Sequence, residues 1–236
     1  MSEAFYDRPR FRACGDRALL AEYGTGIDLA VNRKVHAAAA ALRQRSLTGI
    51  EAVIPAYRNL AVIYDPAAVS FDDLTEALTA LEADLDAAEL AEPRTVDIPV
   101  CYGGPFGPDL DFVAEHNRLT IEAVVRIHSQ TLYPIYAVGF APGFCYLGGL
   151  DPRLRTPRLP TPRTRVPAGS VGIAEAQTGV YPSDSPGGWR LIGRTPLSLF
   201  NPARSDPFLY QAGDRIRFVP VSEADFHRLR AADEAS

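Results

Sequence analysis

Hydrophobic residues repeat with a helical period in two segments of the first hundred residues. Between residues 28 and 45, apolar side chains recur at a spacing that places them on one stripe of a helix. The segment 70–85 shows the helical spacing more strongly, and Ser70 followed by Asp73 is typical of a helix N-terminus. We therefore predict two amphipathic helices, with the stripes Val31, Val35, Ala38 and Leu42, and Phe71, Leu74, Leu78, Leu81 and Leu85.

Strand-like apolar runs surround these helices. They cover residues 11–23, with a break at Gly15-Asp16, and residues 51–55, 59–64 and 95–100. In chain order the elements read β-α-β-β-α-β, the arrangement of a ferredoxin-like domain in which two helices cover one face of a four-stranded sheet. We predict such an α+β domain for residues 1–102.

Beyond residue 102 the pattern changes to short strands separated by glycine and proline. A Gly/Pro-rich joint at 103–108 precedes two short helices, at 109–116 and 120–129, and Ser222 is expected to cap a last helix. Because short strands divided by turns are typical of barrels, we predict a closed or nearly closed β-barrel domain for residues 103–236. Its strands are expected at 133–140, 166–174, 177–181, 189–193, 197–200 and 215–219.

Composition narrows the classes of function. The 236 residues are 47% hydrophobic and 22% charged, as in a soluble globular protein, and the net charge is −5. No apolar run approaches the ~18 residues of a membrane span, and the N-terminal sequence lacks the apolar stretch of a secretory signal. We therefore expect a cytoplasmic protein that acts neither at a membrane nor on nucleic acid.

Arginine is concentrated in one window of this acidic chain. Between Cys145 and Phe200, seven arginines accompany only three acids, so this window carries +4 and the remainder −9. A local cationic surface on an acidic protein favours a small anionic ligand or an acidic partner surface. As an alternative, these arginines pair with the acidic N-terminal half and hold the domains together.

Common catalytic and metal-binding patterns are missing from the sequence. The three cysteines are widely spaced and the four histidines are scattered, so we predict no metal or prosthetic group in this chain. Ser170 stands in AGSVG, which lacks the first glycine of the GxSxG motif and falls in a predicted strand. No spacing supports a dyad of Cys145 with His128, and a histidine such as His128 more often packs than acts as a general acid or base.

The arginine-rich loop is the best candidate for chemistry. In PRTRVP, residues 162–167, Arg163 and Arg165 fall on the same side of an extended segment that the prolines stiffen. Guanidinium groups are suited to bidentate binding of a carboxylate or phosphate. Neutral hydrogen-bonding side chains follow nearby in the sequence. The predicted catalytic set is Arg163, Arg165, Gln177, Tyr181 and Ser185.

Two Gly/Pro-rich loops are predicted to contact substrate or a partner chain. In SPGGW, residues 185–189, exposed backbone N–H groups can hold an anion, and the tryptophan can wall a pocket or anchor an interface. The loop GFAPGF, residues 139–144, is the second. The predicted binding residues are Phe140, Pro142, Gly143, Phe144, Gly188, Trp189 and Arg194.

Four long motifs resemble one protein family. They are GFAPGFCYLGGL (139–150), TPRTRVPAGSVGIA (161–174), QTGVYPSDSPGGWRLIGRTP (177–196) and GDRIRF (213–218). They are similar to motifs of the family of the 5-oxoprolinase B subunit, which includes allophanate hydrolase subunit 1 and the KipI inhibitors of sporulation kinases. The resemblance implies a ferredoxin-like N-terminal domain and a cyclophilin-like β-barrel.

The resemblance also implies an active site shared between chains. Such members act with the A subunit, and with a C subunit homologous to themselves, to open 5-oxo-L-proline, a lactam that carries a carboxylate, to L-glutamate with ATP hydrolysis. The sequence has no Walker motif, so ATP is expected as a co-substrate of the complex and not as a ligand of this chain alone. Two alternatives stay open: a KipI-like inhibitor of a sensor histidine kinase, and an allophanate hydrolase subunit 1 or urea carboxylase-type carboxyltransferase half.

Overall fold

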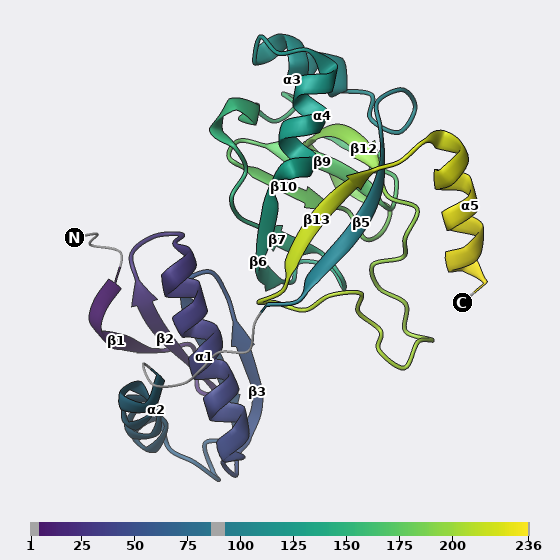
Figure 1. Cartoon of the computed structure of the whole chain (residues 1–236). Coiled ribbons are helices and arrows are strands. Elements are labelled where there is room, and N and C mark those ends of the chain that lie inside the picture. Colours follow the sequence, from purple (N-terminus) through teal and green to yellow (C-terminus); the bar gives the residue numbers. More distant parts are fainter. Residues whose placement is uncertain (1–4, 86–92, 236) are drawn as a thin grey trace. The chain divides into compact units, whose positions relative to one another are not determined.

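The computed structural model describes residues 5–85 and 93–235. Its contacts divide the chain into two compact units, Met1–Glu92 and Pro93–Ser236, each with a hydrophobic core of its own (Figure 1). Residues 93–102, which we expected at the end of the first domain, belong to the second unit.

The first unit is a four-stranded antiparallel sheet with two helices. The strand order is β1-β2-β4-β3. The buried side chains of β2 and β4 form one core with those of both helices, so the helices cover one face of the sheet (Figure 1). The elements are β1 (Phe5–Ala13), β2 (Ala18–Gly24), α1 (Leu29–Arg45), β3 (Ile50–Pro55), β4 (Asn59–Tyr64) and α2 (Phe71–Leu85).

The expected ferredoxin-like order is not the order of this unit. The segment 11–23 is the inner part of a hairpin, because the chain turns between Cys14 and Ala18 and β1 pairs with β2. The strand expected to close the domain, β5 (Thr95–Tyr102), pairs instead with strands of the second unit. The order is therefore β-β-α-β-β-α. An alternating pattern identifies a strand, but it does not identify the neighbour to which that strand bonds.

The two predicted helices form, and their N-termini have side-chain caps. Asp28 accepts hydrogen bonds from the backbone N–H groups of Ala30 and Val31 at 2.8 and 3.2 Å. At α2 the predicted cap is confirmed: Ser70 accepts from the N–H of Asp73 at 3.1 Å, and the Asp73 carboxylate accepts from the N–H of Ser70 at 3.2 Å. These bonds satisfy donors that the first helical turn leaves unpaired.

The second unit is built on a seven-stranded sheet of order β10-β9-β12-β5-β13-β6-β7. The end strands β10 and β7 also pack against each other, so the sheet is a nearly closed barrel (Figure 1). β5 runs parallel to β13, and the other neighbours are antiparallel. The strands are β6 (Leu132–Val138), β7 (Cys145–Leu147), β9 (Ser170–Ala174), β10 (Gln177–Val180), β12 (Arg190–Arg194) and β13 (Arg215–Pro220).

A two-stranded ribbon, three α-helices and a short 3-10 helix (Pro152–Leu154) complete the described part of this unit. The ribbon pairs β8 (Arg163–Val166) with β11 (Ser185–Gly187). The predicted strand 166–174 is divided into β8 and β9 by a turn at Gly169, whose φ of +82° favours glycine. The predicted strand 197–200 forms only a single bridge, between Phe200 and Phe208. The α-helices, all expected, are α3 (Leu110–His116), α4 (Ile121–Gln130) and α5 (Glu223–Glu234).

His128 lies fully buried in the core of the second unit. Its Nε2 is 2.9 Å from the hydroxyl of Thr178, which donates its own proton to the carbonyl of Gly172 at 3.0 Å. The Thr178 oxygen therefore accepts from Nε2–H, and Nδ1 accepts from the hydroxyl of Tyr102 at 2.8 Å. The neutral ring satisfies both partners, and burial lowers the pKa of His128 to about 3. His128 is a core residue rather than a general acid or base.

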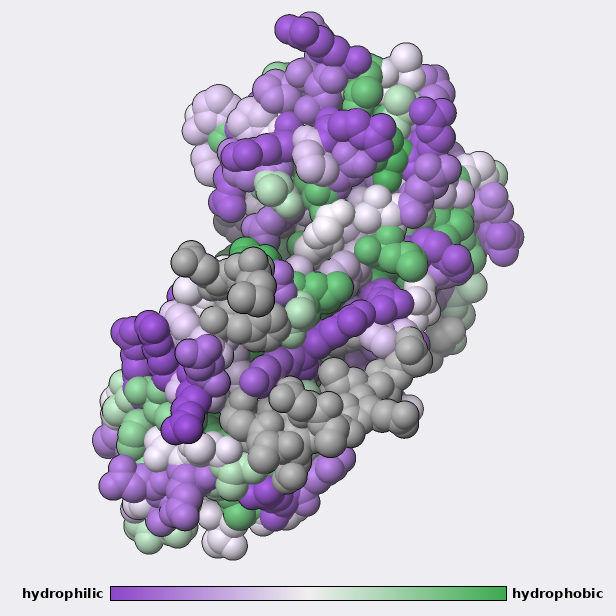
Figure 2. Space-filling view, turned by 60° about the vertical axis from the view of Figure 1, so that its left-hand side comes forward, coloured by the Kyte–Doolittle hydropathy of each residue, from purple (hydrophilic) through white to green (hydrophobic). Residues whose placement is uncertain are grey.

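Polar side chains cover most of the face shown in Figure 2, and hydrophobic ones form smaller patches on it (Figure 2). In the described part of the chain, no helix combines the length and the apolar character needed to cross a membrane.

The burial of His128 predicts a loss of stability in acid. Its pKa in the folded chain, about 3, is below the ordinary value of 6.5, so the unfolded chain takes up the proton first as the pH falls. The stabilisation is therefore present above the unfolded pKa and is lost progressively as the pH falls toward the folded pKa. From about pH 7 to about pH 5 we expect the free energy of unfolding to fall by about 2 kcal/mol through this group alone.

Urea unfolding of the wild type and of His128→Gln at both pH values measures this effect. The variant is expected to lose less stability between the two pH values than the wild type does. His227→Gln, which changes an exposed histidine of α5, is the matched control and keeps the wild-type loss. Equal losses in His128→Gln and the wild type would contradict the prediction.

Candidate functional site

A pocket of about 240 Å³, here called the aromatic pocket, brings together several of the predicted residues. Three Gly/Pro-rich or aromatic segments of the second unit and one arginine form its walls. The lining residues are Phe140, Phe144, Tyr146, Arg158, Tyr181, Pro186, Gly187, Gly188 and Trp189. Five of them, Phe140, Phe144, Tyr181, Gly188 and Trp189, belong to the sets that the sequence indicated.

Three buried aromatic rings form the rigid wall of this pocket. Phe144, Tyr181 and Trp189 contact one another edge to face, with centroid distances of 6.1 to 6.2 Å. They form a small hydrophobic cluster of their own with Val166 and Leu191. Edge-to-face packing fixes the orientation of each ring, so the wall has a defined shape before any ligand arrives.

Tyr181 places its hydroxyl group beside the ribbon strand β11. A Cβ atom at Gly187 would lie 2.5 Å from that hydroxyl oxygen, so only glycine fits opposite Tyr181. Burial raises the pKa of Tyr181, although the backbone N–H of Trp189 and the charges of Arg158 and Arg163 favour the phenolate. The phenol therefore stays protonated at neutral pH and can act as a hydrogen-bond donor or a proton source.

Most arginines of the cationic window contact a nearby acid. Five of the seven have a carboxylate within 4.0 Å, and each of these acids lies in the second unit. The pairs are Arg153–Asp151 (2.7 Å), Arg155–Glu175 (3.5 Å), Arg163–Asp109 (2.9 Å), Arg165–Asp184 (2.7 Å) and Arg190–Asp109 (4.0 Å).

Arg158 and Arg194 are the two arginines of this window that have no acidic partner among the described residues of the second unit, 93–235. Each of them lines a pocket, Arg158 the aromatic pocket and Arg194 a second one. An unpaired guanidinium group at a pocket is available to an anionic ligand. Arg158 is exposed and is close enough to favour the charged form of Tyr181. The sequence window contained Arg158 but gave no sign that its charge stays unpaired.

Arg163 and Arg165 do not form the joint anion clamp that their spacing indicated. Arg163 donates to Asp109 at 2.9 Å and to the carbonyl of Trp189 at 3.3 Å. It therefore fixes the backbone of Trp189, a residue of the pocket wall, without lining the pocket itself. Arg165 is exposed and is bound to Asp184. The alternation of a strand places the two side chains on one side. The position of each guanidinium group is then set by the carboxylate with which it pairs.

Asp109 is a buried carboxylate that connects this wall to the barrel. One of its oxygens accepts from Arg163 at 2.9 Å, and the other accepts from the backbone N–H of Leu191 at 2.7 Å. The backbone N–H of Asp109 donates in turn to the carbonyl of Leu191 at 2.9 Å. The side chain thus fixes β8 against β12 just beyond Trp189. Sequence reasoning missed this role, because Asp109 stands 54 residues from Arg163.

The other predicted residues do not line the aromatic pocket. Gln177 begins β10 opposite Ala174, and Ser185 begins β11 next to Pro186. Pro142 is exposed. The carbonyl of the buried residue Gly143 accepts a hydrogen bond from the hydroxyl of Tyr210 at 2.6 Å, so this carbonyl anchors the loop and is not offered to a ligand.

Phe140 combines an unfavourable backbone with an exposed ring. Its φ is +71°, in the left-handed region that favours glycine, and the residue is 78% exposed. Its ring lies edge to face on Phe144 at 5.6 Å, at the border of the aromatic pocket. A non-glycine residue in this region is strained by about 1 kcal/mol. The strain and the exposure together mark the loop 139–144 as a surface that a ligand or partner can cover.

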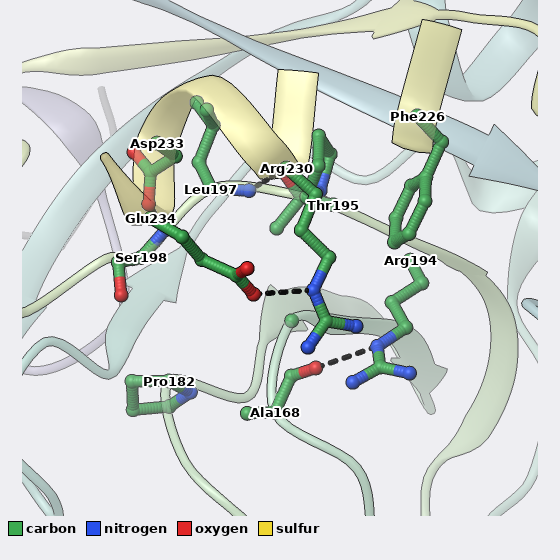
Figure 3. Close-up of a pocket in the computed structure, with 12 residues that line it drawn as sticks. Ala168, Pro182, Arg194, Thr195, Leu197, Ser198, Phe226, Arg230, Asp233 and Glu234 are labelled. Carbon is green, nitrogen blue, oxygen red and sulfur yellow. Dashed lines mark hydrogen bonds and ion pairs between the residues drawn. The ribbon is translucent and has the colours of Figure 1, made fainter. Parts of the chain in front are cut away.

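The second pocket, of about 130 Å³, contains the predicted residue Arg194, and we call it the Arg194 pocket (Figure 3). The segment after β12, the turn between β8 and β9, and helix α5 form its walls. Arg194 donates through Nε to the carbonyl of Ala168 at 2.7 Å. The structure thus separates Arg194 from the aromatic pocket, with which the sequence had grouped it.

The candidate nucleophiles lie inside the core. Ser170 is buried in β9, and burial raises the pKa of the Cys145 thiol to about 11, so neither is exposed and activated. Within the described residues, no cluster of three or more histidine, cysteine or acidic side chains could hold a metal ion.

Comparison with known proteins places the chain in a family. The family model of the carboxyltransferase domain, subdomain C and D, matches residues 9–210. The chain belongs to this family. Both pockets lie largely within the matched region, except for the side chains that α5 contributes to the Arg194 pocket.

Relatives of this carboxyltransferase-domain chain include full-length bacterial proteins. It is 46% identical to the 5-oxoprolinase B subunit of Bacillus subtilis over 94% of this chain and 97% of that protein. It is 43% identical to the 5-oxoprolinase B subunit of Escherichia coli O157:H7 over 92% and 98% of the two chains. A more distant relative is the urea amidolyase of Lachancea kluyveri, 27% identical over 93% of this chain and 14% of that protein.

A solved structure has the same fold within a longer chain. The crystal structure of TTHA0988 superposes with a TM-score of 0.77 at 40% identity, covering 87% of this chain and 40% of that one. The carboxyltransferase-domain chain therefore corresponds to about 40% of the length of TTHA0988.

The role of Asp109 predicts a clear loss of stability on its replacement. Asp109→Asn keeps one acceptor for the N–H of Leu191 but leaves the partly buried guanidinium of Arg163 without its counter-charge. We expect the free energy of unfolding to fall by about 2–3 kcal/mol. Urea unfolding measures it.

Asp97→Asn is the matched control for this variant. Asp97 pairs with Arg217 at 2.6 Å, but both side chains are about half exposed. Its loss is expected to stay below about 1 kcal/mol. Equal losses in the two variants would show that Asp109 does not brace the wall of the pocket.

Proposed function

We propose that the chain is the B subunit of an ATP-dependent 5-oxoprolinase, which acts with the A and C subunits to convert 5-oxo-L-proline to L-glutamate. The observation that supports this most is the 46% identity to the Bacillus subtilis 5-oxoprolinase B subunit over nearly the full length of both proteins. The identity to two urea amidolyases is 27% or less, and the chain covers only 14% of each of those proteins. The higher identity to 5-oxoprolinase B subunits therefore favours the conversion of 5-oxo-L-proline over a reaction of urea.

The aromatic pocket suits the proposed substrate. 5-Oxo-L-proline is a small ring with one carboxylate and a lactam group. In the proposed complex, Arg158 binds the carboxylate, the rings of Phe144 and Trp189 pack against the methylene groups, and the Tyr181 hydroxyl donates a hydrogen bond to the lactam. The support is that Arg158, unlike Arg163, has no carboxylate partner among the described residues of the second unit and lies beside a protonated phenol.

Ring opening requires water to add to the lactam carbonyl and the C–N bond to break, with the nitrogen becoming the amino group of glutamate. A negative charge develops on the carbonyl oxygen, and hydrogen-bond donors at that oxygen stabilise it. Tyr181 is the donor that this chain offers in the pocket. We propose that ATP, a co-substrate of the complex, and the activation of water are handled by residues of the A and C subunits.

A partner chain is proposed to close the aromatic pocket. Arg158 and Phe140 are exposed, so a ligand bound between them would stay in contact with water unless another surface covers it. The C subunit, expected to be homologous to this chain, is the proposed cover. We also propose that the nearly closed sheet is a cyclophilin-like barrel, and that the protein is cytoplasmic, which the three free cysteines support.

The test is reconstitution with the purified A and C subunits, ATP and 5-oxo-L-proline, with glutamate as the readout. Glutamate formation must depend on this chain, and this chain alone must form none. If leaving it out does not change the rate, the proposal fails. Stoichiometric binding to a sensor histidine kinase, with loss of its autophosphorylation, would instead favour the KipI-like alternative.

Arg158→Gln is expected to weaken substrate binding in the reconstituted complex. Removing a charge-assisted bond to the carboxylate raises the KM for 5-oxo-L-proline by about tenfold or more. Arg155→Gln is the matched control, because Arg155 is a similarly exposed arginine that is paired with Glu175, and its KM stays within about twofold. Equal KM values for Arg158→Gln and the wild type would remove Arg158 from the site.

Phe140→Ala is expected to weaken association with the C subunit while leaving the stability of the isolated chain nearly unchanged. The exposed ring contributes little to the core, so the free energy of unfolding of the isolated chain changes by less than about 0.5 kcal/mol. Association with the C subunit, measured by calorimetry, weakens by about tenfold or more if Phe140 is an interface anchor. Wild-type affinity in this variant would place the partner on another surface.

A further inference from the structure

The Arg194 pocket brings two guanidinium groups together. Arg194 comes from the end of β12 and Arg230 from α5, and in Figure 3 the terminal nitrogens of both groups point away from the helix toward the same side of the pocket (Figure 3). Two guanidinium groups at short range repel each other unless an anion lies between them.

The two arginines are held by contacts that leave their terminal nitrogens unused. Arg194 donates through Nε to the carbonyl of Ala168 at 2.7 Å, and Arg230 donates through Nε to Glu234 at 2.8 Å. Among the described residues, no other hydrogen bond or ion pair of either group is found. Each guanidinium group therefore keeps its two terminal nitrogens for a further acceptor.

The other carboxylate of the pocket, that of Asp233, already has hydrogen-bond partners. Asp233 accepts from Arg204 at 2.8 Å and from the backbone N–H of Ser198 at 2.9 Å. It does not reach Arg194. Of the three arginines at or beside this pocket, Arg204 and Arg230 have a carboxylate and Arg194 has none, so the local charge is positive.

The surroundings of Arg194 disfavour its charge. Partial burial, and then the neighbouring charge of Arg230, lower the pKa of Arg194, and Asp184 offsets this only in part. The position of Arg194 is nevertheless fixed, because Asp184 accepts from the backbone N–H of Ala168 at 2.8 Å and so holds the turn whose carbonyl binds Arg194. The fold thus holds an unsatisfied cation at the wall of a small pocket.

We propose that the Arg194 pocket binds a small oxyanion, the carboxylate or phosphoryl group of a metabolite, between the guanidinium groups of Arg194 and Arg230. A tetrahedral or planar oxyanion can accept hydrogen bonds from both guanidinium groups at once. Its negative charge attracts both arginines and so offsets the repulsion between them. The volume of about 130 Å³ admits such a group but not a whole nucleotide. The site is separate from the aromatic pocket and does not depend on the proposed function.

The test uses the full chain alone, because the pocket is complete within it. Inorganic phosphate and, in a parallel arm, acetate replace chloride at constant ionic strength, and the backbone amide signals of Gly169 and Ser198 are followed by NMR. We expect saturable shifts of these signals. Saturation by phosphate alone identifies a phosphoryl site, by acetate alone a carboxylate site, and by both a general oxyanion site.

Three variants test whether the two arginines form the site. Arg194→Gln and Arg230→Gln are each expected to weaken the apparent affinity by about tenfold or more. Arg230→Gln is the more decisive, because it leaves the bond between Arg194 and Ala168 intact. Arg228→Gln, which changes an exposed arginine of α5 paired with Asp225, is the control and keeps the affinity within about twofold. Shifts no larger than those in chloride, or unchanged affinity in Arg230→Gln, would overturn the proposal.

Discussion

The candidate site depends on one buried carboxylate. Asp109 stands just before α3, yet it accepts hydrogen bonds from the guanidinium of Arg163 in β8 and from the backbone of Leu191 in β12. A buried carboxylate is strongly disfavoured unless such partners surround it, so its presence fixes both strands in one arrangement. Trp189 lies between these contacts, and its carbonyl is itself bound by Arg163. The aromatic wall is rigid because its support is electrostatic as well as hydrophobic.

Charge pairing around this support explains which arginines can be functional. A net excess of positive charge in a window of sequence says that some arginines must pair with acids outside the window or stay unpaired, but not which ones. In the folded chain five arginines contact four carboxylates of the second unit, because Arg163 and Arg190 share Asp109, and Arg158 and Arg194 contact none of the described acids of this unit. Each of these two borders a separate pocket. The two unpaired arginines therefore belong to two separate local sites.

Local patterns predicted the local structure well. The stripes of both helices of the first unit, the Ser70 cap and the Gly/Pro-divided strands of the second unit depend on neighbours in the sequence. The sequence pattern of β5 did not show to which sheet this strand belongs, because its alternation fits either one. Its actual partners, β12 and β13, lie far along the chain. The same limit applied to the site, where spacing placed Arg163 and Arg165 together and distant acids separated them. The aromatic residues were found because their loops are unusual in sequence.

The filled barrel explains why the candidate ligands bind at its margins. Its core contains His128, with both ring nitrogens bonded to Tyr102 and Thr178, and a continuous set of aliphatic and aromatic side chains. A small barrel packed in this way has no room for a substrate inside it. Binding groups must therefore come from the loops and from the ribbon β8–β11, whose residues are partly exposed. A site on such a margin is open to water, and a second protein surface can close it without any change in the barrel itself.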